Sequence, residues 1–284
     1  MTLTAMKLCY GDNTLELGQR VHVMGILNVT PDSFSDGGRL ANKETLLQRA
    51  ESMIAAGVDI LDIGGESTRP FAAKVELDEE LNRVIPAIRS IRHQFSIPIS
   101  IDTTKAAVAK KAIEAGADII NDVNALRFDS RMIEVAKKHN TPVILMHMQG
   151  KPGDMQKKPC YDDVITDIST FLQERLDWAE RNGLDRSRMI VDPGIGFGKS
   201  LEHNLTILKH LDQFSTFGVP LLLGHSRKAF IGTILELDDP GQRDCATAAI
   251  SALAVMAGVS ILRVHDVEKT VQAVRLAEAI KDAV

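Results

Sequence analysis

The sequence predicts an α/β protein of the closed (β/α)8, or TIM, barrel class, preceded by an N-terminal β-hairpin. Eight short apolar runs recur along the 284-residue chain, and most lack alternation, which is typical of strands buried on both faces. Segments with helical spacing separate these runs. Eight strand and helix units over about 250 residues are typical of such a barrel. An open, doubly wound sheet is the alternative.

The expected elements follow one another along the chain with short connections. Residues 7–20 carry turn residues between two short candidate strands, so we expect a hairpin that covers the N-terminal mouth of the barrel. We expect residues 1–284 to form one domain. Left-handed helix caps are expected at Gly57, Gly116, Asn140, Gly183 and Gly258. The apolar runs begin at Val21, Val58, Ile97, Ala117, Thr141, Arg188, Val219 and Val259, and the helical segments are residues 43–57, 80–95, 105–116, 130–139, 163–183, 201–211, 242–258 and 267–284.

Composition argues against several classes of protein. Only 4% of the residues are aromatic, so an aliphatic core of parallel strands and helices is favoured over an aromatic-rich sandwich. The net charge of -5 and scattered basic residues argue against a nucleic-acid surface. We find no signal peptide pattern and no apolar run that could span a bilayer. The widely spaced Cys9, Cys160 and Cys245 fit reduced thiols, so we expect a soluble, cytoplasmic protein.

Polar side chains stand where nearly every expected strand ends. In a parallel barrel the active site lies at the carboxyl ends of the strands, so these positions indicate a shared mouth rather than a core. The stretch MGILNVTPDSFSDGG shows the pattern, because its apolar strand runs directly into Asn28. The corresponding residues of the other strands are Asp62, Glu66, Thr68, Arg69, Asp102, Asn121, Asp122, Met146, His147, Asp192, His225, Ser226, Arg227, Lys228, Arg263, His265 and Asp266.

Structural roles compete with ligand-binding roles at these positions. Asp122, Asp266 and Thr104 are equally well explained as N-caps of the helices that follow. Asp102 and Asp192 end apolar strands, and a buried carboxylate needs a partner or a shifted pKa. We therefore expect both to bind a ligand.

Positive charge gathers at two neighbouring strand ends. Arg227, Lys228 and Arg263 predict an anion pocket there. The alternative is a set of internal salt bridges to Asp102, Asp192 and Glu66.

Two further patterns resemble known sites without matching them. GIGFGKS, from Gly194, is one residue short of the P-loop spacing, so we expect its glycines to give backbone freedom beside a flat ligand. His147, His225 and His265 come from different strands and no cysteine joins them, which argues against a zinc site. We expect structural or anion-binding roles for these histidines.

Eight motifs, in their order along the chain, resemble those of bacterial dihydropteroate synthases. They are MGILNVTPDSFSDGG, GGESTRP, SIDTTK, IINDV, LMHMQG, VDPGIGFGK, GHSRK and RVHDV. The resemblance implies a homodimeric (β/α)8 enzyme of folate biosynthesis. It condenses 6-hydroxymethyl-7,8-dihydropterin diphosphate with 4-aminobenzoate to give 7,8-dihydropteroate and diphosphate, with Mg²⁺ present, and sulfonamides compete with 4-aminobenzoate.

The residue chemistry suits a pterin substrate. A pterin edge presents adjacent N–H donors that a buried carboxylate at Asp192 can accept. Asn121 and Asp102 can meet the other polar atoms of the pterin. Met146 and Phe197 can supply flat apolar surfaces beside the ring.

The resemblance assigns roles to the remaining residues. Asn28 holds Mg²⁺, whose other ligands are diphosphate oxygens and water. Arg263, which can also stack on the pterin, holds the diphosphate with Thr68 and His265. Lys228 contacts the carbonyl side of the pterin. The residues that frame 4-aminobenzoate are Arg69, Pro70 and Ser226.

The expected mechanism needs no protein nucleophile. The bond from carbon to the diphosphate oxygen breaks early and leaves a cationic methylene, which the arylamine attacks. Preorganised charges stabilise such a transition state most effectively. The expected catalytic residues are therefore Asp102 near the ring and Lys228, Arg263 and His265 near the leaving group.

Two residues depart from the family pattern. Phe71 stands where glycine is usual, and Ala229 stands where serine is usual, so the resemblance leaves sulfonamide sensitivity open. The alternative functions are a pterin-dependent methyltransferase domain, which would not need the cationic set at Lys228 and Arg263, and a non-catalytic pterin-binding protein.

Overall fold

The computed structural model describes residues 6–11, 13–29, 39–67, 74–151 and 153–283, with the backbone alone at 39–42. Its main sheet contains eight parallel strands. They are β3 (His22–Asn28), β4 (Ile60–Gly64), β5 (Ile99–Asp102), β6 (Ile119–Asp122), β7 (Val143–Met146), β8 (Met189–Asp192), β9 (Leu222–Leu223) and β10 (Ile261–Val264).

The main sheet closes on itself. Its strand order is β8-β7-β6-β5-β4-β3-β10-β9. A parallel bridge between Val191 and Leu221 joins the two ends of this order, and Val191 N donates to the carbonyl of Pro220 at 3.0 Å. The predicted (β/α)8 barrel is confirmed.

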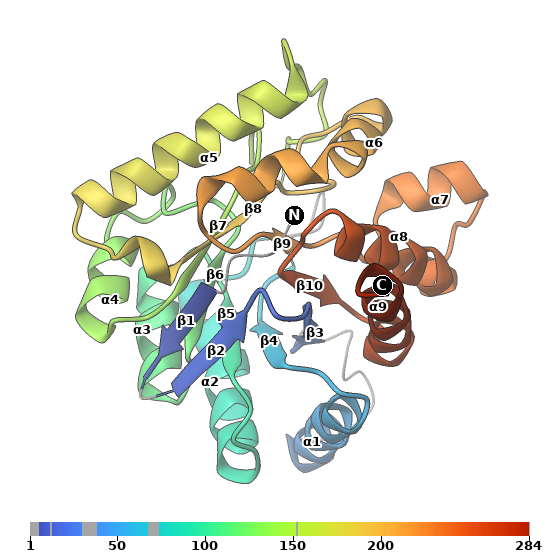
Figure 1. Ribbon diagram of the computed structural model, residues 1–284. Coiled ribbons are helices and arrows are strands. Elements are labelled where there is room, and N and C mark those ends of the chain that lie inside the picture. The colour runs from blue at the N-terminus through green and yellow to red at the C-terminus, as the bar shows by residue number, and fades with distance from the viewer. Residues whose placement is uncertain (1–5, 12, 30–38, 68–73, 152, 284) are drawn as a thin grey trace.

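Helices surround the strands, as Figure 1 shows. The predicted caps at Gly57, Gly116, Asn140, Gly183 and Gly258 all have positive φ. One helix, residues 229–235, was not predicted, because seven residues are too few to show a helical period. The helices are α1 (Arg39–Ala55), α2 (Leu77–Gln94), α3 (Ala106–Glu114), α4 (Met132–His139), α5 (Val164–Arg181), α6 (Leu201–Lys209), α7 (Ala229–Leu235), α8 (Asp244–Met256) and α9 (Val267–Lys281), with 3-10 turns η2 (Arg186–Arg188), η3 (Leu211–Phe217) and η4 (Pro240–Arg243).

The predicted hairpin is present at the N-terminal end of the barrel. Strands β1 (Met6–Tyr10) and β2 (Asn13–Leu17) pair antiparallel and lie in front of the barrel strands in Figure 1. Leu8 and Leu17 of the hairpin are almost fully buried. They form one apolar cluster with residues from the beginnings of the barrel strands, namely Met24, Ile60, Ile119, Ile144, Ile190, Leu222 and Ile261. The hairpin therefore closes this mouth of the barrel.

The interior of the barrel changes from apolar to polar along its axis. Side chains two residues apart on a strand point the same way, so Asp62 follows Ile60 into the interior and Arg263 follows Ile261. Ile60 and Ile261 pack in the apolar cluster, whereas Asp62 and Arg263 are hydrogen-bonded to each other. The polar layer lies toward the carboxyl ends of the strands.

The outward side chains of the strands join a larger core beneath the helices. Leu61 and Ile63 of β4 and Leu262 and Val264 of β10 belong to it. Among the described helices, we find none with the length and apolar character needed to cross a membrane.

Candidate functional site

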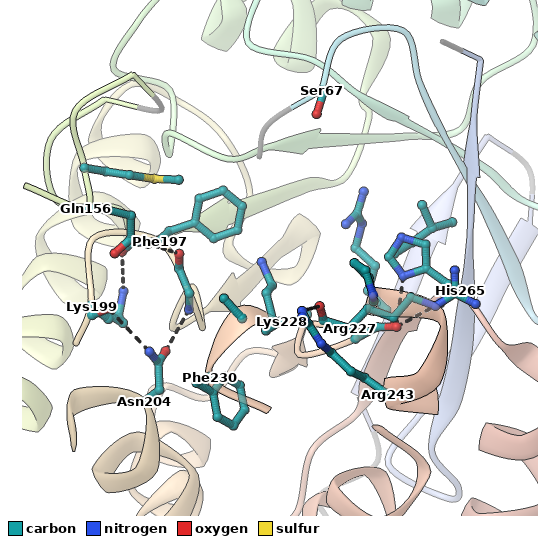
Figure 2. A pocket seen from close by; sticks show the side chains of 18 of the residues that line it. Ser67, Gln156, Phe197, Lys199, Asn204, Arg227, Lys228, Phe230, Arg243 and His265 are labelled. Carbon is teal, nitrogen blue, oxygen red and sulfur yellow. Dashed lines mark hydrogen bonds between the residues drawn. The ribbon is translucent and has the colours of Figure 1, made fainter. Parts of the chain in front are cut away.

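A cavity of about 710 Å³ opens at the carboxyl ends of the strands. Figure 2 shows Lys228 between Phe197 on one side and His265 on the other. The predicted site residues that line the cavity are Asn28, Asp102, Phe197, Ser226, Lys228, Arg263 and His265. Lining residues that the sequence did not indicate as site residues include Ile26, Gln156, Lys199, Asn204, Phe230 and Arg243.

Arg263 joins the carboxyl ends of three strands beneath the cavity. Its Nε donates to Asp62 Oδ2 and its Nη2 to Asp102 Oδ2, both at 2.7 Å. Asn121 Nδ2 lies 3.3 Å from the same Asp62 oxygen. The internal salt bridge between Arg263 and Asp102 is thus present. Asp62 was named among the polar residues at the strand ends but was given no role, although strand alternation places its side chain in the same polar layer as that of Arg263.

Both carboxylates that we expected to bind a ligand are buried. Burial raises the pKa of Asp102 to about 7, with Arg263 opposing the rise and Asp62 adding to it. Burial raises the pKa of Asp192 to about 6, against the hydrogen bond from Gly194 N at 2.7 Å. Among the described residues, Asp102 Oδ1 has no hydrogen-bond partner. Each carboxyl therefore takes up a proton more readily than an exposed one.

Three predicted residues lie beside the cavity rather than among its described lining residues: Asn121, Met146 and Asp192. Asn121 contacts the lining through Asp62, the partner of Arg263. Asp192 Oδ2 lies 3.4 Å from the point where a Cβ on Gly224 would stand, and Gly224 lines the cavity.

One side of the cavity is apolar and polarizable. Lys228 Nζ lies 4.0 Å from the centre of the Phe197 ring, within the range of a cation–π interaction. Phe197 belongs to a buried cluster with Met146 and Met148, together with Val123 and Met155. This side offers flat and deformable surfaces to a planar ligand.

The opposite side is formed by Ser226 and His265. Ser226 Oγ and His265 Nδ1 are 2.9 Å apart, and the backbone N–H of His265 donates to the same oxygen at 3.2 Å.

Arg227 forms two hydrogen bonds of 2.7 Å with Asp244. The charge of Arg227 is therefore neutralised within the fold, by a partner that the sequence analysis did not consider.

The predicted residues Thr68, Arg69 and Pro70, and also Phe71, lie outside the described residues. Glu66 and Ser67, which precede them, line the cavity. Glu66 forms a salt bridge with Lys105 and accepts a hydrogen bond from Val75 N at 3.1 Å.

The three candidate caps have different roles. Asp266 caps α9, because Oδ1 accepts a hydrogen bond of 3.0 Å from Lys269 N. Asp122 holds two backbone N–H groups of the loop after β6, each at 2.9 Å, and is not an N-cap. Thr104, for which a capping role was left open, is not a cap, since Lys105 occupies the cap position of α3.

The candidate histidines have separate partners. His147 Nδ1 lies 2.9 Å from Lys199 Nζ, and His225 Nε2 lies 2.9 Å from the carbonyl oxygen of Thr247 on α8. His265 pairs with the serine described above. Within the described ranges, no group of three or more His, Cys, Asp or Glu residues is arranged to hold a metal ion.

The glycines of the GIGFGKS segment are required by its backbone. Gly194, Gly196 and Gly198 have φ values of 71°, 80° and 64°, a region that favours glycine. A Cβ on Gly194 would lie only 1.9 Å from the carbonyl oxygen of His147. These positions therefore need glycine, and Gly196 and Phe197 of the same segment line the cavity.

Comparison with known proteins identifies close relatives of this chain. The model of the family "Pterin binding enzyme" matches residues 24–265. A dihydropteroate synthase from a Synechocystis species is 46% identical over 270 residues, which are 95% of this chain and 93% of the relative.

Two solved structures are similar over nearly their whole length. The Yersinia pestis dihydropteroate synthase, solved as a sulfonamide drug complex, has a TM-score of 0.92 and 46% identity, covering 98% of this chain and 100% of that one. The Xanthomonas albilineans dihydropteroate synthase, solved with 4-aminobenzoic acid, has a TM-score of 0.92 and 44% identity, covering 99% of this chain and 100% of that one.

Asp62→Asn is expected to lower the pKa of Asp102 below its value of about 7. The substitution removes a like charge and leaves Arg263 to neutralise one carboxylate instead of two. Between pH 3.8 and about 7, Asp102 keeps its proton in the native protein but loses it in the unfolded chain. The contribution of Asp102 to the free energy of unfolding therefore falls as the pH rises through this window. A carboxyl NMR titration measures the shift.

Asp78→Asn on α2 is the control, because Asp78 is exposed and is not among the charged groups that shift the pKa of Asp102, which are Arg263, Asp62, Glu80 and Asp122. The control should leave the titration of Asp102 unchanged. An unaltered pKa in Asp62→Asn would contradict the coupling.

Proposed function

This chain belongs to the dihydropteroate synthase family of transferases, as its motifs indicated, and we propose that it condenses 6-hydroxymethyl-7,8-dihydropterin diphosphate with 4-aminobenzoate. The products are 7,8-dihydropteroate and diphosphate. The main support is one cavity in which the Arg263 pair with Asp102 lies near Lys228 and the Ser226–His265 pair. Such a cavity offers negative potential for a cationic ring and donors for a leaving diphosphate.

The pterin is proposed to bind on the side of Asp192 and Phe197. The Asp192 carboxylate accepts two adjacent N–H groups of the pterin, while Asn121 and Asp102 meet its remaining polar atoms. Phe197, backed by Met146 in the same apolar cluster, covers one face of the ring. The near-neutral pKa of Asp192 suits this role, because donors from the ligand favour its ionised form.

The diphosphate is proposed to bind Arg263, His265 and Thr68, with Lys228 between this group and the pterin. The bond from the methylene carbon to the diphosphate oxygen breaks with its electron pair passing to the leaving group. The 4-aminobenzoate nitrogen then forms the new bond to carbon and loses a proton to solvent. Asp102, Lys228, Arg263 and His265 stabilise the separated charges, which in such sites lowers the barrier by about 3 to 4 kcal/mol per contact.

The arylamine is proposed to lie between Ser226 and the segment with Arg69 and Pro70. Ser67, directly before that segment, lines the cavity, and Figure 2 shows it across the cavity from Phe230. The relative from Xanthomonas was solved with 4-aminobenzoic acid and that from Yersinia with a sulfonamide. We infer that sulfonamides compete with 4-aminobenzoate in this chain.

Asn28 is proposed to hold Mg²⁺. A Cβ on Gly64 would stand 3.4 Å from Asn28 Oδ1 and 3.8 Å from Asp102 Oδ2, so an amide and a carboxylate oxygen lie near the same point of β4, and Asn28 and Asp102 both line the cavity. Hard oxygen ligands of this kind suit Mg²⁺, which retains water and takes diphosphate oxygens as further ligands. When bound, the ion neutralises negative charge on the diphosphate.

Residues 1–284 are proposed to form one domain in the cytoplasm. The hairpin shares a buried cluster with the barrel strands, which supports a single folding unit. Cys9, Cys160 and Cys245 are free thiols, as is usual in a reducing compartment.

The function is tested by following diphosphate release with both substrates and Mg²⁺. Release should depend on 4-aminobenzoate and yield 7,8-dihydropteroate. Methyl transfer to a corrinoid acceptor instead would support the methyltransferase alternative, and pterin binding without turnover would support a non-catalytic protein.

Asp192→Asn is expected to lower kcat/KM for the pterin substrate by about 10- to 100-fold, because a hydrogen bond to a charged group contributes about 1.5 to 3 kcal/mol. Wild-type kcat/KM should also fall as pH drops below the Asp192 pKa of about 6. The exposed variant Asp78→Asn should match the wild type in steady-state kinetics. Unchanged kinetics in Asp192→Asn would rule out this pterin contact.

Removing divalent ions with EDTA should abolish diphosphate release, and added Mg²⁺ should restore it. Asn28→Ala is expected to raise the Mg²⁺ concentration for half-maximal rate by about tenfold, since it removes one ligand. Asn82→Ala, at an exposed position of α2, is the control. An unchanged Mg²⁺ requirement in Asn28→Ala would exclude Asn28 as a ligand.

The chain is proposed to form a homodimer through α8 and α9. These packed helices expose Leu253 (69%), Met256 (54%), Leu276 (65%) and Ile280 (62%), a grouping that is typical of an interaction surface. Sedimentation should give twice the mass of one chain, and the double variant Leu253→Glu with Leu276→Glu should give the single mass. Leu205→Glu on α6 should keep the dimer, and a monomeric wild type would refute it.

A further inference from the structure

Lys199, the last residue but one of GIGFGKS, is a buried lysine that the proposed reaction does not use. Its exposed fraction is 3%, although lysine is rarely buried without a partner. Nζ lies 2.9 Å from His147 Nδ1 and donates to the carbonyl oxygen of Phe197 at 3.1 Å. One ammonium group thus joins the end of β7 to the turn that carries the aromatic side of the cavity.

Other side chains hold the rest of this turn. Gly196 N donates to Asn204 Oδ1 at 2.7 Å, and Gln156 Nε2 donates to the Gly196 carbonyl at 2.6 Å. Tyr161 Oη donates to the Gly198 carbonyl at 2.7 Å. The Phe197 carbonyl lies between these two carbonyls along the chain, and it accepts a hydrogen bond from Lys199 Nζ.

His147 is a firm anchor for the other end of the bridge. Its backbone N–H donates to the Asp192 carbonyl at 2.9 Å, and its ring packs edge-on against Phe171 at 4.8 Å. Burial lowers the pKa of His147 to about 2, so its ring is neutral and Nδ1 can accept a hydrogen bond from Lys199 Nζ. The bridge therefore links Phe197 to the strand end next to Asp192.

Charge also couples Lys199 to the cavity. Burial lowers the pKa of Lys199 to about 7, against the attraction of Asp192 and with repulsion from Lys228. A loss of Lys199 would thus disturb the position of Phe197 and remove a cation that favours the ionised form of Asp192.

We infer that Lys199 is a positioning residue that holds the Phe197 ring, through the Phe197 carbonyl and His147, in the place where it covers the pterin. The inference rests on the proposed pterin site. Lys199 therefore has a role that involves no contact with phosphate, although its segment resembles a P-loop.

A double-mutant cycle tests whether Lys199 acts through Phe197. Pterin binding is measured by titration with 6-hydroxymethylpterin for the wild type, Lys199→Met, Phe197→Leu and the double variant. Each single variant should weaken binding about tenfold. The double variant should lose little more than either single one, because coupled residues are not additive. Losses that multiply to about a hundredfold, or no loss in Lys199→Met, would overturn the inference.

Kinetics separate positioning from a general loss of folded protein. Lys199→Met should raise KM for the pterin diphosphate about tenfold while changing kcat less than about twofold, whereas partial unfolding would lower kcat and leave KM unchanged. Lys137→Met, at an exposed position of α4 that does not belong to the described lining of the cavity, is the matched control and should behave as the wild type. If Lys199→Met does not fold, Lys199→Gln, whose shorter side chain cannot serve both acceptors, replaces it in the cycle.

Wild-type turnover distinguishes this inference from the proposed function. If wild-type protein binds pterin but releases no diphosphate, the function fails while the binding cycle still tests Lys199. If turnover is present and Lys199→Met binds pterin as the wild type does, the inference alone fails.

Discussion

The site depends on the guanidinium of Arg263 lying between two buried carboxylates. Asp62 and Asp102 come from neighbouring strands, and each accepts a hydrogen bond of 2.7 Å from this one side chain. Without it, two like charges would face each other inside the barrel, where the cost of an unpaired charge is several kcal/mol. The two hydrogen bonds also fix the plane of the guanidinium, so that it is already oriented when a ligand binds above it.

The apolar layer beneath makes this arrangement effective. Isoleucines of five strands and two leucines of the hairpin fill the barrel below the polar layer. Water is excluded from that side, so the field of the charged groups is directed toward the cavity and is weakly screened. The raised pKa of Asp102 and of Asp192 reports the same low polarity. Core packing and site electrostatics thus have a common cause.

Much of the architecture followed from local sequence. Each barrel strand was recognisable as a short aliphatic run, and the residues after it marked the mouth. The helix α7 was missed because seven residues carry too little periodicity. The role of Asp122 was left open, because an aspartate directly after a strand can equally be a helix cap, and its hydrogen bonds to the following loop became visible only in the structure.

The contacts across the barrel could not be read from the sequence. Asp62 and Arg263 are 201 residues apart, and only the closed sheet brings them together. Asp62 was recognised as a polar residue of the mouth, but its partner on β10 could not be identified from the sequence. The role of Lys199 was not predicted for another reason. Its segment was interpreted through its glycines, whereas the partners of Lys199, which are His147 and the Phe197 carbonyl, are brought to it by tertiary packing.

The hairpin closes the N-terminal end of the barrel, so the cavity has no second opening at that end. Leu8 and Leu17 leave no passage along the barrel axis. Substrates and products must therefore both pass through the opening at the carboxyl ends of the strands. A ligand bound at the innermost carboxylates and one bound nearer the rim therefore enter and leave through the same opening.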